Sequence, residues 1–271
     1  MAERMQTSRR WRLPVSTPRL IGLILISIVA LAAVFAPWIS PYSPIESSMD
    51  ILMPSSPEHF LGTDELGRDL LSRIIYGGRV SLSVGMGAAL MAALIGLPMG
   101  LLAGYFGGRT DALVSYVINL FIAMPTLVLA LMITAVIGAS FKNIILVLGF
   151  VNWPRLARLV RGETLVIRER LFVEAAQVAG ANAWWILRRH IEPNTRRLVL
   201  PQLSLTVAEA IFTASSLSFL GLGIAPPRPD WGGMVRTGVD YLPISPLFAI
   251  GPSLAVAITI SVFYLRGKSE Q

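Results

Sequence analysis

The stretch EAAQVAGANAWWILRRHIEPN, residues 174–194, is a polar island between apolar stretches that are long enough to cross a bilayer. Glu174 and the two alanines after it predict a helical turn. Gly180 is expected to end this turn, because glycine adopts the positive φ of a helix C-terminus without a steric penalty. A second amphipathic segment with two tryptophans follows, and Pro193 fits the start of the next helix. The pattern predicts a helix-turn-helix that projects from a membrane and is gripped by another protein.

The chain as a whole is too apolar for a soluble globular protein. Of its 271 residues, 54% are apolar and 14% are charged, whereas about a quarter of the residues of a soluble protein are charged. We therefore expect an all-α polytopic membrane protein that forms a single domain. The absence of cysteine excludes disulfides and thiolate metal sites.

Six stretches with almost no charged residues are expected to cross the membrane, because a helical span needs about 20 apolar residues. They are residues 20–45, 80–108, 112–141, 143–154, 198–227 and 241–265. The fourth stretch is short. We expect its helix to begin near Gly138, with Arg155 and Arg158 at its inner end reaching toward the headgroups.

The basic residues indicate which side of the membrane each loop occupies. They concentrate in the N-terminal tail, in the segment after the fourth span and at the C-terminus. Positive charge marks cytoplasmic loops, so both termini and the 174–194 stretch are expected in the cytoplasm. The predicted segments are a cytoplasmic arm (1–19), a first transmembrane helix (20–39), an extracytoplasmic segment with an amphipathic helix (40–79), a transmembrane core (80–266) with a cytoplasmic loop (168–194), and a short cytoplasmic tail (267–271).

The extracytoplasmic segment contains HFLGTDELGRDLLSRIIYGGRVSL, residues 59–82. Thr63 or Asp64 is predicted to cap the helix that follows, since short polar side chains are favoured at the N-cap. Asp69 and Arg73 are four positions apart and are predicted to form an ion pair on one helical face. Further on, Gly96, Gly100 and Gly104 form the small-xxx-small spacing that permits close helix packing in lipid.

Four separated motifs, in order along residues 60–234, resemble the permeases of ABC importers. The first is the 59–82 block, and the second is AMPTLVLAL, which begins at Ala123. The third is Glu-Ala-Ala at 174–176 with the glycine and proline spaced after it, and the fourth is LSFLGLGIAPPRPDWGGM, residues 217–234. They resemble in particular the second membrane subunit of dipeptide, oligopeptide and nickel importers, the DppC- and OppC-like permeases. Glu192 departs from the pattern, since leucine is usual there.

This resemblance implies a type I ABC-importer permease fold with six transmembrane helices, in the bacterial cytoplasmic membrane. It implies a heterodimer with a homologous permease subunit, two cytoplasmic ATPase subunits that hold ATP and Mg, and an extracytoplasmic substrate-binding protein. No cofactor, metal or nucleic acid is expected on this chain. The expected substrate is a di- or oligopeptide, and nickel or a metal-metallophore complex is the alternative. The residues expected to contact the ATPase are Glu174, Ala175, Ala176, Gly180, Ala181, Trp184, His190 and Pro193.

Two further groups of candidate residues follow from the motifs. The residues expected to stabilise an outer gate or to dock the binding protein are Gly62, Thr63, Asp64, Gly67, Arg68, Asp69, Arg73, Pro226, Pro227 and Trp231. The pathway candidates are Glu209, Thr213, Asn119 and Pro125. Glu209 is the acid inside a predicted span. It is expected either to line the pathway and receive a cationic group, or to be a buried, protonated carboxyl that holds subunits together.

Other classes of function have weaker support. Gly267, Lys268 and Ser269 match the end of a phosphate-binding loop, but Val262 stands where that loop needs glycine. A membrane enzyme would need metal ligands or acid–base pairs at membrane depth, and the two histidines fall in loops on opposite faces. An ion-coupled carrier or channel would show inverted repeats or several charges within its spans.

Overall fold

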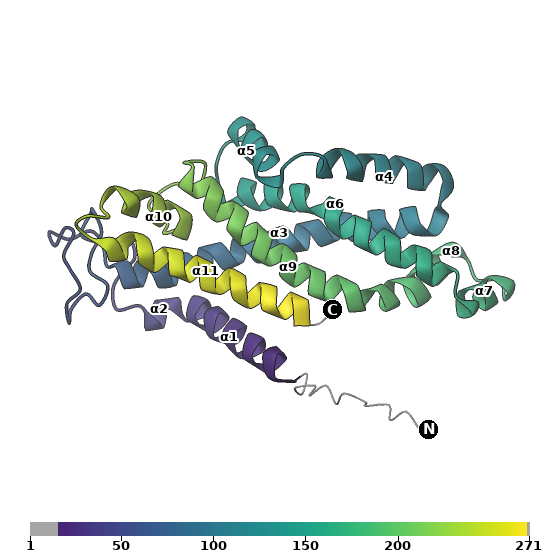
Figure 1. The fold of residues 1–271 in the computed structure, drawn as a ribbon, viewed down its shortest axis with the longest axis horizontal. Helices are drawn as coiled ribbons and strands as arrows, with labels where there is room; N and C mark the ends of the chain where they lie inside the picture. Colours follow the sequence, from purple (N-terminus) through teal and green to yellow (C-terminus); the bar gives the residue numbers. More distant parts are fainter. Residues whose placement is uncertain (1–15, 270–271) are drawn as a thin grey trace, which may run out of the picture.

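The computed structural model describes residues 16–269, and Figure 1 shows that they form a bundle of helices. The helices are α1 (Ser16–Val34), α2 (Ala36–Ile39), α3 (Leu70–Phe106), α4 (Gly108–Ile122), α5 (Thr126–Ile137), α6 (Phe141–Arg168), α7 (Leu171–Val178), α8 (Ala183–Ile186), the π-helical turn η1 (Leu187–Ile191), α9 (Glu192–Phe219), α10 (Trp231–Asp240) and α11 (Pro246–Ser269). The only β-type pairing within residues 16–269 is an isolated bridge between Thr63 and Asp69. The prediction of an all-α chain is confirmed.

Four helical stretches in the described part are long and apolar enough to cross a membrane. They are α3, α6, the continuous stretch Ala183–Phe219, and Pro246–Lys268 of α11. Helices α4 and α5 together reach the required length but bend by 88° between them, which gives a fifth span if the pair is counted as one. Among the residues of α1 whose side chains are described, Ile24–Val34 form a shorter apolar helix. Residues 1–15 of the predicted cytoplasmic arm and the last two residues of the predicted tail lie outside the described residues.

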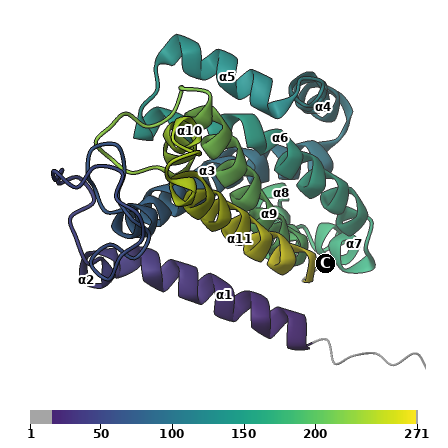
Figure 2. The same ribbon diagram turned by 60° about the vertical axis from the view of Figure 1, so that its left-hand side comes forward.

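The central packing is between α3 and α6, which run side by side through the bundle (Figure 2). The predicted glycine row of α3 provides this contact. A Cβ added to Gly96 would lie 2.7 Å from the carbonyl oxygen of Trp153, and one added to Gly100 would lie 2.6 Å from that of Ala157. Because any side chain would push the two backbones apart, these glycines allow α3 and α6 to approach closely.

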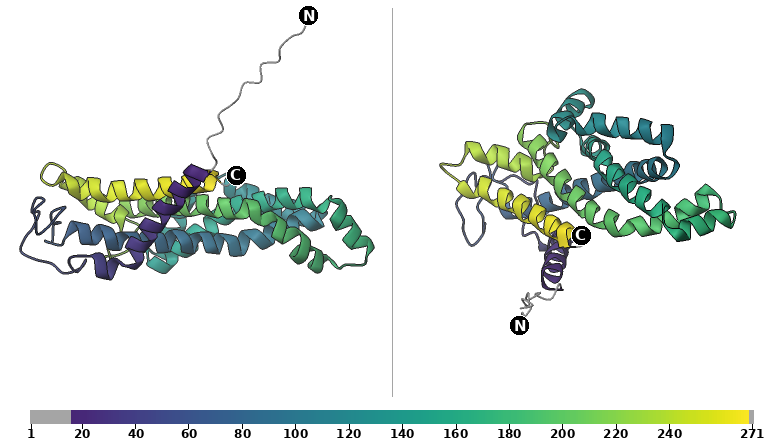
Figure 3. Two further views of the ribbon diagram at one scale, coloured as in Figure 1. Left: turned by 90° about the horizontal axis from the view of Figure 1, so that it is seen from below. Right: turned by 45° about the vertical axis from the view of Figure 1, so that its right-hand side comes forward.

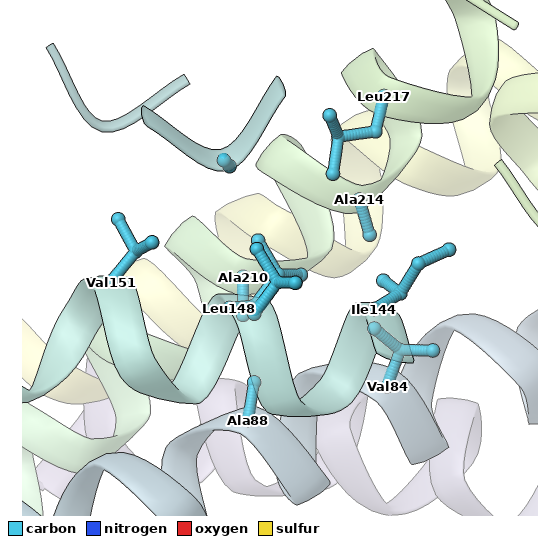
Figure 4. Close-up of a cluster of buried hydrophobic side chains, with 10 residues drawn as sticks. Val84, Ala88, Ile144, Leu148, Val151, Ala210, Ala214 and Leu217 are labelled. Atoms are coloured by element: carbon cyan, nitrogen blue, oxygen red, sulfur yellow. The ribbon is translucent and has the colours of Figure 1, made fainter. Parts of the chain in front are cut away.

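A buried apolar cluster joins α3, α5, α6 and α9. Figure 4 shows Val84 and Ala88 of α3 facing side chains of α6 and α9. The buried members of the cluster are Val84, Ala88, Ala130, Ile144, Val147, Leu148, Val151, Ala210, Ala214 and Leu217. Most are small or β-branched, which suits close packing of helices.

Two regions of irregular or short structure lie at opposite ends of the long bundle (Figure 1). Residues 40–69 and α10 lie at one end, and α7 and α8 lie at the other. Helix α1 crosses the bundle obliquely and contacts α3 and α11 (Figure 3). Each end carries a different group of candidate residues, and the long helices extend from one group to the other.

Two expected boundaries differ from the structure. The amphipathic helix predicted within residues 59–82 is not separate, because α3 runs without a break from Leu70 to Phe106. At 1.5 Å per residue, its 37 residues exceed a hydrocarbon core of about 30 Å, so its first turns extend beyond the membrane. The fourth span is also longer than predicted, because α6 continues through Pro154 to Arg168.

Candidate functional site

The turn after α7 has the hydrogen bonds of a Schellman motif. Gly180 has a φ of 84°, its N–H donates to the carbonyl of Gln177 at 2.9 Å, and the N–H of Ala181 donates to that of Ala176 at 3.0 Å. These two bonds satisfy carbonyls that the end of a helix leaves unpaired. Gly180 thus ends the helix that contains Glu174, as its position in the sequence predicts.

A buried apolar cluster anchors this segment to the bundle. It consists of Ile167, Val173, Ile186, Leu187 and Ile191, with Leu101, Tyr105, Ala176 and Ala181 packed against it. The segment therefore rests on the inner ends of α3 and α6. The cluster thus holds this segment against these two helices.

The opposite side of the same segment exposes large apolar side chains. The exposed fractions are 82% for Leu171, 85% for Val178 and 68% for Trp184. Glu174 and Ala175 are exposed beside them. A group of exposed apolar side chains with polar neighbours is typical of a protein–protein interface. We call residues 171–185 the coupling surface.

The helix-turn-helix prediction is wrong at one point. The second helix does not end before Pro193, because Ala183–Phe219 is continuous. Proline has no N–H to donate and crowds the preceding turn. The wider π-helical turn η1 directly precedes α9 and accommodates Pro193 near the start of α9. His190 lies in this turn, with its ring 4.9 Å from the ring of Trp185 between centroids.

At the end of the bundle that carries α10, the 62–73 block folds around a fully buried aspartate. Asp64 accepts hydrogen bonds from the backbone N–H groups of Leu66 and Arg68, both at 2.9 Å. Its other oxygen, Oδ2, lies 2.7 Å from Arg68 Nε and 3.1 Å from Arg73 Nε. Glu65 pairs with Arg68 at 3.0 Å, so two carboxylates balance two guanidinium groups.

Two predictions for this block are wrong. Asp69 and Arg73 do not form an ion pair, and neither Thr63 nor Asp64 is the N-cap residue of α3. Arg73 contacts Asp64 and the carbonyl of Pro44, while Asp69 accepts from the N–H of Ser72 at 2.7 Å and caps α3. His59 lies 2.9 Å from the remaining oxygen of Asp69. Asp69 is the N-cap residue and its side chain faces the helix start, so it is not free to reach Arg73 on the next turn.

Two glycines of this block have positive φ, 81° at Gly62 and 71° at Gly67. A Cβ at either position would lie 2.3 Å from a backbone carbonyl oxygen, that of Met53 or of Ser48. Thr63, which lies between them, is buried and donates its hydroxyl hydrogen bond to the carbonyl of Asp50. These contacts hold residues 48–53 against the block.

The fold brings the 217–234 motif against the 59–82 motif. Trp231, at the start of α10, donates from Nε1 to the carbonyl of Ile74 at 2.8 Å. Pro226 lines a cavity of about 490 Å³ together with Arg68, Arg73 and Asp230. Arg68 is 6% exposed and Trp231 is 3% exposed, and their part in an outer gate or in docking stays a prediction. Pro226 and Pro227 are exposed and remain accessible to a partner.

Asp230 caps α10 from within this region, outside the membrane-spanning helices. Its side chain accepts from the N–H of Gly233 at 2.9 Å. Burial raises the pKa of the Asp230 carboxyl above its ordinary value, although hydrogen bonds from Ser218 and from two backbone N–H groups act in the opposite direction. Burial dominates because it disfavours the ionised form.

Midway along the bundle, Glu209 of α9 forms an ion pair with Arg155 of α6. The distance from Arg155 Nη1 to Glu209 Oε2 is 2.5 Å, and the side chains are 43% and 42% exposed. The same guanidinium donates from Nη2 to the hydroxyl of Thr126 at 3.0 Å. Arg155 therefore does not reach toward headgroups as predicted, because it lies at the middle of a longer helix and has a partner there.

Arg158 lies one turn further along α6 and donates to the side-chain oxygen of Asn119 at 2.7 Å. Asn119 belongs to α4 and Thr126 to α5, so the two arginines contact both sides of the break between these helices. Pro125 is exposed within the break and is the N-cap residue of α5. The chain changes direction by 88° at this break, between α4 and α5.

Thr213 does not belong to this face. It is 5% exposed, and its hydroxyl donates to the carbonyl of Glu209 at 2.8 Å. Thr206 is likewise buried and bonded to its own helix. Thr213, one of the pathway candidates, is therefore buried within the bundle and not exposed beside Glu209. Polar side chains from four helices instead lie together around Glu209. They are residues 119, 126, 155, 158 and 209, and we call this group the polar face.

Sequence reasoning missed Arg155 and Arg158 as members of this face. Their spacing of three positions is the signal that was available, because residues three apart lie on the same side of a helix. Exposed charges at the depth of the bilayer centre cost about 2.5–3.5 kcal/mol each when they face lipid. The polar face must therefore meet water or another protein subunit.

Comparisons with known proteins agree with this architecture. Residues 96–267 match the model of the family described as "Binding-protein-dependent transport system inner membrane component". Residues 11–57 match the "N-terminal TM domain of oligopeptide transport permease C". The chain belongs to the binding-protein-dependent transport system inner membrane components, the permease subunits of ABC importers.

Individual relatives cover most of the chain. The glutathione transport system permease protein GsiD of Pectobacterium atrosepticum is 39% identical over 91% of this chain and 82% of its own length. The dipeptide transport system permease protein DppC of Alkalihalophilus pseudofirmus is 36% identical over 92% and 82%. The probable D,D-dipeptide transport system permease protein DdpC of Escherichia coli is 34% identical over 95% and 87%.

The fold also matches a solved transporter. An inward-facing structure of the MetNI methionine ABC transporter aligns with a TM-score of 0.60 at 19% identity, over 73% of this chain and 94% of that one. The resemblance inferred from the four motifs is thus confirmed at the level of family. The likeness to the methionine transporter concerns the fold alone.

Proposed function

We propose that this chain is the permease subunit through which an ABC importer moves di- or oligopeptides across the bacterial cytoplasmic membrane. The names of the relatives support a peptide substrate, since they include dipeptide, D,D-dipeptide and glutathione permeases. Nickel or a metal-metallophore complex is the alternative substrate. The proposed topology has six spans, with α1 as the first, the bent α4–α5 pair as the third and both termini in the cytoplasm.

The observation that carries this proposal is the coupling surface. It is rigidly anchored on α3 and α6 and exposes Leu171, Val178 and Trp184 beyond the end of the bundle. An ATPase subunit seated there would bury these side chains. ATP and Mg would be bound by two such partner subunits, not by this chain. A homologous permease subunit would lie opposite the polar face, across the translocation pathway, and a binding protein would deliver the substrate at the end of the bundle opposite the coupling surface.

In this arrangement the transport cycle is alternating access. Closure of the ATPase pair moves the two coupling surfaces, and the anchoring cluster passes that motion to α3 and α6. A ligand shifts such an equilibrium only by its different affinity for the two states. The binding protein with its substrate must therefore favour the outward-open state, and by linkage that state favours bound ATP.

The test is to replace Val178 by glutamate and to measure co-purification of the ATPase subunits together with ATP-driven uptake in proteoliposomes. Glutamate at a buried apolar contact should abolish both, because an unpaired charge would lose its hydration there. The matched control is Met49→Glu, which changes a side chain that is 96% exposed and lies at the opposite end of the helix bundle (Figure 1). If Val178→Glu retains the ATPases and full uptake, the coupling surface has another role. Uptake of nickel without uptake of a dipeptide by the unmodified complex would decide for the alternative substrate.

A further inference from the structure

The polar face contains one complete ion pair with both charges accessible. Arg155 and Glu209 come from different helices and are each more than two-fifths exposed. Structural ion pairs at membrane depth usually have their charges enclosed, because exposure to lipid is costly. This pair lies open at the middle of the bundle, beside the break between α4 and α5.

Positive charge is concentrated at one side of the pair. Arg155 bonds to Thr126, the first residue of α5. The N-terminus of α5 has no side-chain cap, and the N-terminus of a helix carries a partial positive charge. Arg158 adds a second guanidinium one turn away, held by a neutral partner, Asn119. This side is therefore suited to an anionic group such as a carboxylate.

The other side of the pair offers a carboxylate. Glu209 is bonded to Arg155 by one oxygen, Oε2. An ammonium group can approach the exposed part of this side chain. Asp111, the acidic residue of α4, forms an ion pair with Arg161. The distance from Arg161 Nη2 to Asp111 Oδ2 is 2.7 Å. Among the five residues that define the polar face, Glu209 is the acid.

We propose that Arg155 and Glu209 form a binding site for zwitterionic peptides in the translocation pathway. This inference rests on the proposed function and names the groups that recognise its substrate. The peptide carboxylate binds Arg155, assisted by Arg158 and the start of α5, and the peptide ammonium binds Glu209. The internal ion pair opens as the substrate enters and forms again as it leaves.

This exchange explains why the two charges are paired when no substrate is bound. A single unpaired charge at this depth would be strongly destabilising. In the exchange, each charge leaves one partner of opposite sign for another, so neither is left unpaired at any stage. Both end groups of the peptide are likewise kept paired while they cross the low-dielectric region.

The experiment uses the complete transporter complex in lipid nanodiscs, without the binding protein, so that the selectivity of that protein does not enter. The probes are alanyl-alanine, N-acetyl-alanyl-alanine and alanyl-alanine amide. Affinity is measured by titrating the shift in melting temperature of the complex. The unmodified complex should bind alanyl-alanine about tenfold or more tightly than either blocked peptide, which is the loss expected for one charged hydrogen bond.

The variants separate the two halves of the site. Arg155→Gln should abolish the preference for alanyl-alanine over its amide and keep the preference over the N-acetyl peptide. Glu209→Gln should do the converse. The matched control is Asp111→Asn, which removes the ion pair between Asp111 of α4 and Arg161 of α6 but should keep both preferences.

Three outcomes would overturn the inference: no binding of alanyl-alanine to the unmodified complex, equal binding of the three peptides, or loss of both preferences in each single variant. Uptake of alanyl-alanine by the same complex with its binding protein is measured in parallel. Uptake with no charge-dependent binding would overturn the site and leave the proposed function standing. Absence of uptake would instead contradict the proposed function.

Discussion

Trp231 donates a hydrogen bond of 2.8 Å to the carbonyl of Ile74, although the two residues are 157 positions apart. The indole ring lies directly against α3, where a Cβ on Gly77 would come within 2.8 Å of it. This contact joins α10 to the N-terminal end of α3 and so connects the 59–82 and 217–234 motifs. We expect it to determine how tightly that end of the bundle is held.

Replacing Trp231 by phenylalanine tests this contact. The variant keeps an aromatic ring but removes the donor and leaves a space beside Gly77. We expect the purified protein to lose about 1–3 kcal/mol of stability, as is typical when a buried hydrogen-bond donor is removed. Thermal unfolding in detergent measures the loss. An unchanged melting temperature would show that α10 is held by other contacts.

The turn at Gly180 allows a comparison of two alanine substitutions. A Cβ on Gly180 or on Gly162 would meet no atom within 4 Å, but only Gly180 has a positive φ. Gly180→Ala should therefore cost about 1–2 kcal/mol from backbone strain alone and reduce ATPase association. Gly162→Ala, in the interior of α6, should be neutral or slightly stabilising. Equal behaviour of the two variants in co-purification and thermal unfolding would contradict this reasoning.

The close packing of α3 on α6 predicts a steric effect. Gly100→Val would place a branched side chain where a Cβ alone is 2.6 Å from the carbonyl oxygen of Ala157. Overpacking of this kind costs about 1–3 kcal/mol. We expect lower yield and a lower melting temperature of the assembled complex. Gly162→Ala again serves as the control, and a Gly100→Val complex of unchanged stability would mean that the helices can separate freely.

The buried carboxylate of Asp64 predicts a large loss of stability on substitution. Asp64→Ala leaves the guanidinium groups of Arg68 and Arg73 without their central partner. Removal of one member of a buried ion pair costs about 3–5 kcal/mol. The control is Glu192→Gln, which breaks the pair with Arg196, whose side chain is 64% exposed, and should cost less than about 1 kcal/mol. Similar melting temperatures for the two variants would argue against a buried cluster.

Asp230 predicts a dependence of stability on pH. Because burial raises the pKa of this carboxyl, the folded state binds a proton more tightly than the unfolded state. Stability from this group therefore falls as the pH rises above the unfolded value, near 3.8, and is lowest above the folded pKa. Asp230→Asn keeps a cap for α10 and should raise the melting temperature more at neutral than at mildly acidic pH. A gain that does not depend on pH would show that ionisation of Asp230 is not the cause.

The sequence by itself determined the features that depend on neighbouring residues. Long apolar stretches dictate transmembrane helices, because unpaired backbone groups are too costly in lipid. The end of α7 at Gly180 follows from the local φ that glycine permits, and the break at Pro125 follows from the missing N–H of proline. The four motifs were sufficient to predict the family.

Only the tertiary structure decided which distant groups become partners. Asp64 rather than Asp69 receives Arg73, because Asp69 is already engaged in capping α3. Arg155 meets Glu209 rather than the headgroups, because the length of α6 and the 88° bend between α4 and α5 set the depth and the direction of its side chain. Local periodicity assigns a residue to a face of its own helix, but the rotation and depth of each helix in the bundle determine what that face meets.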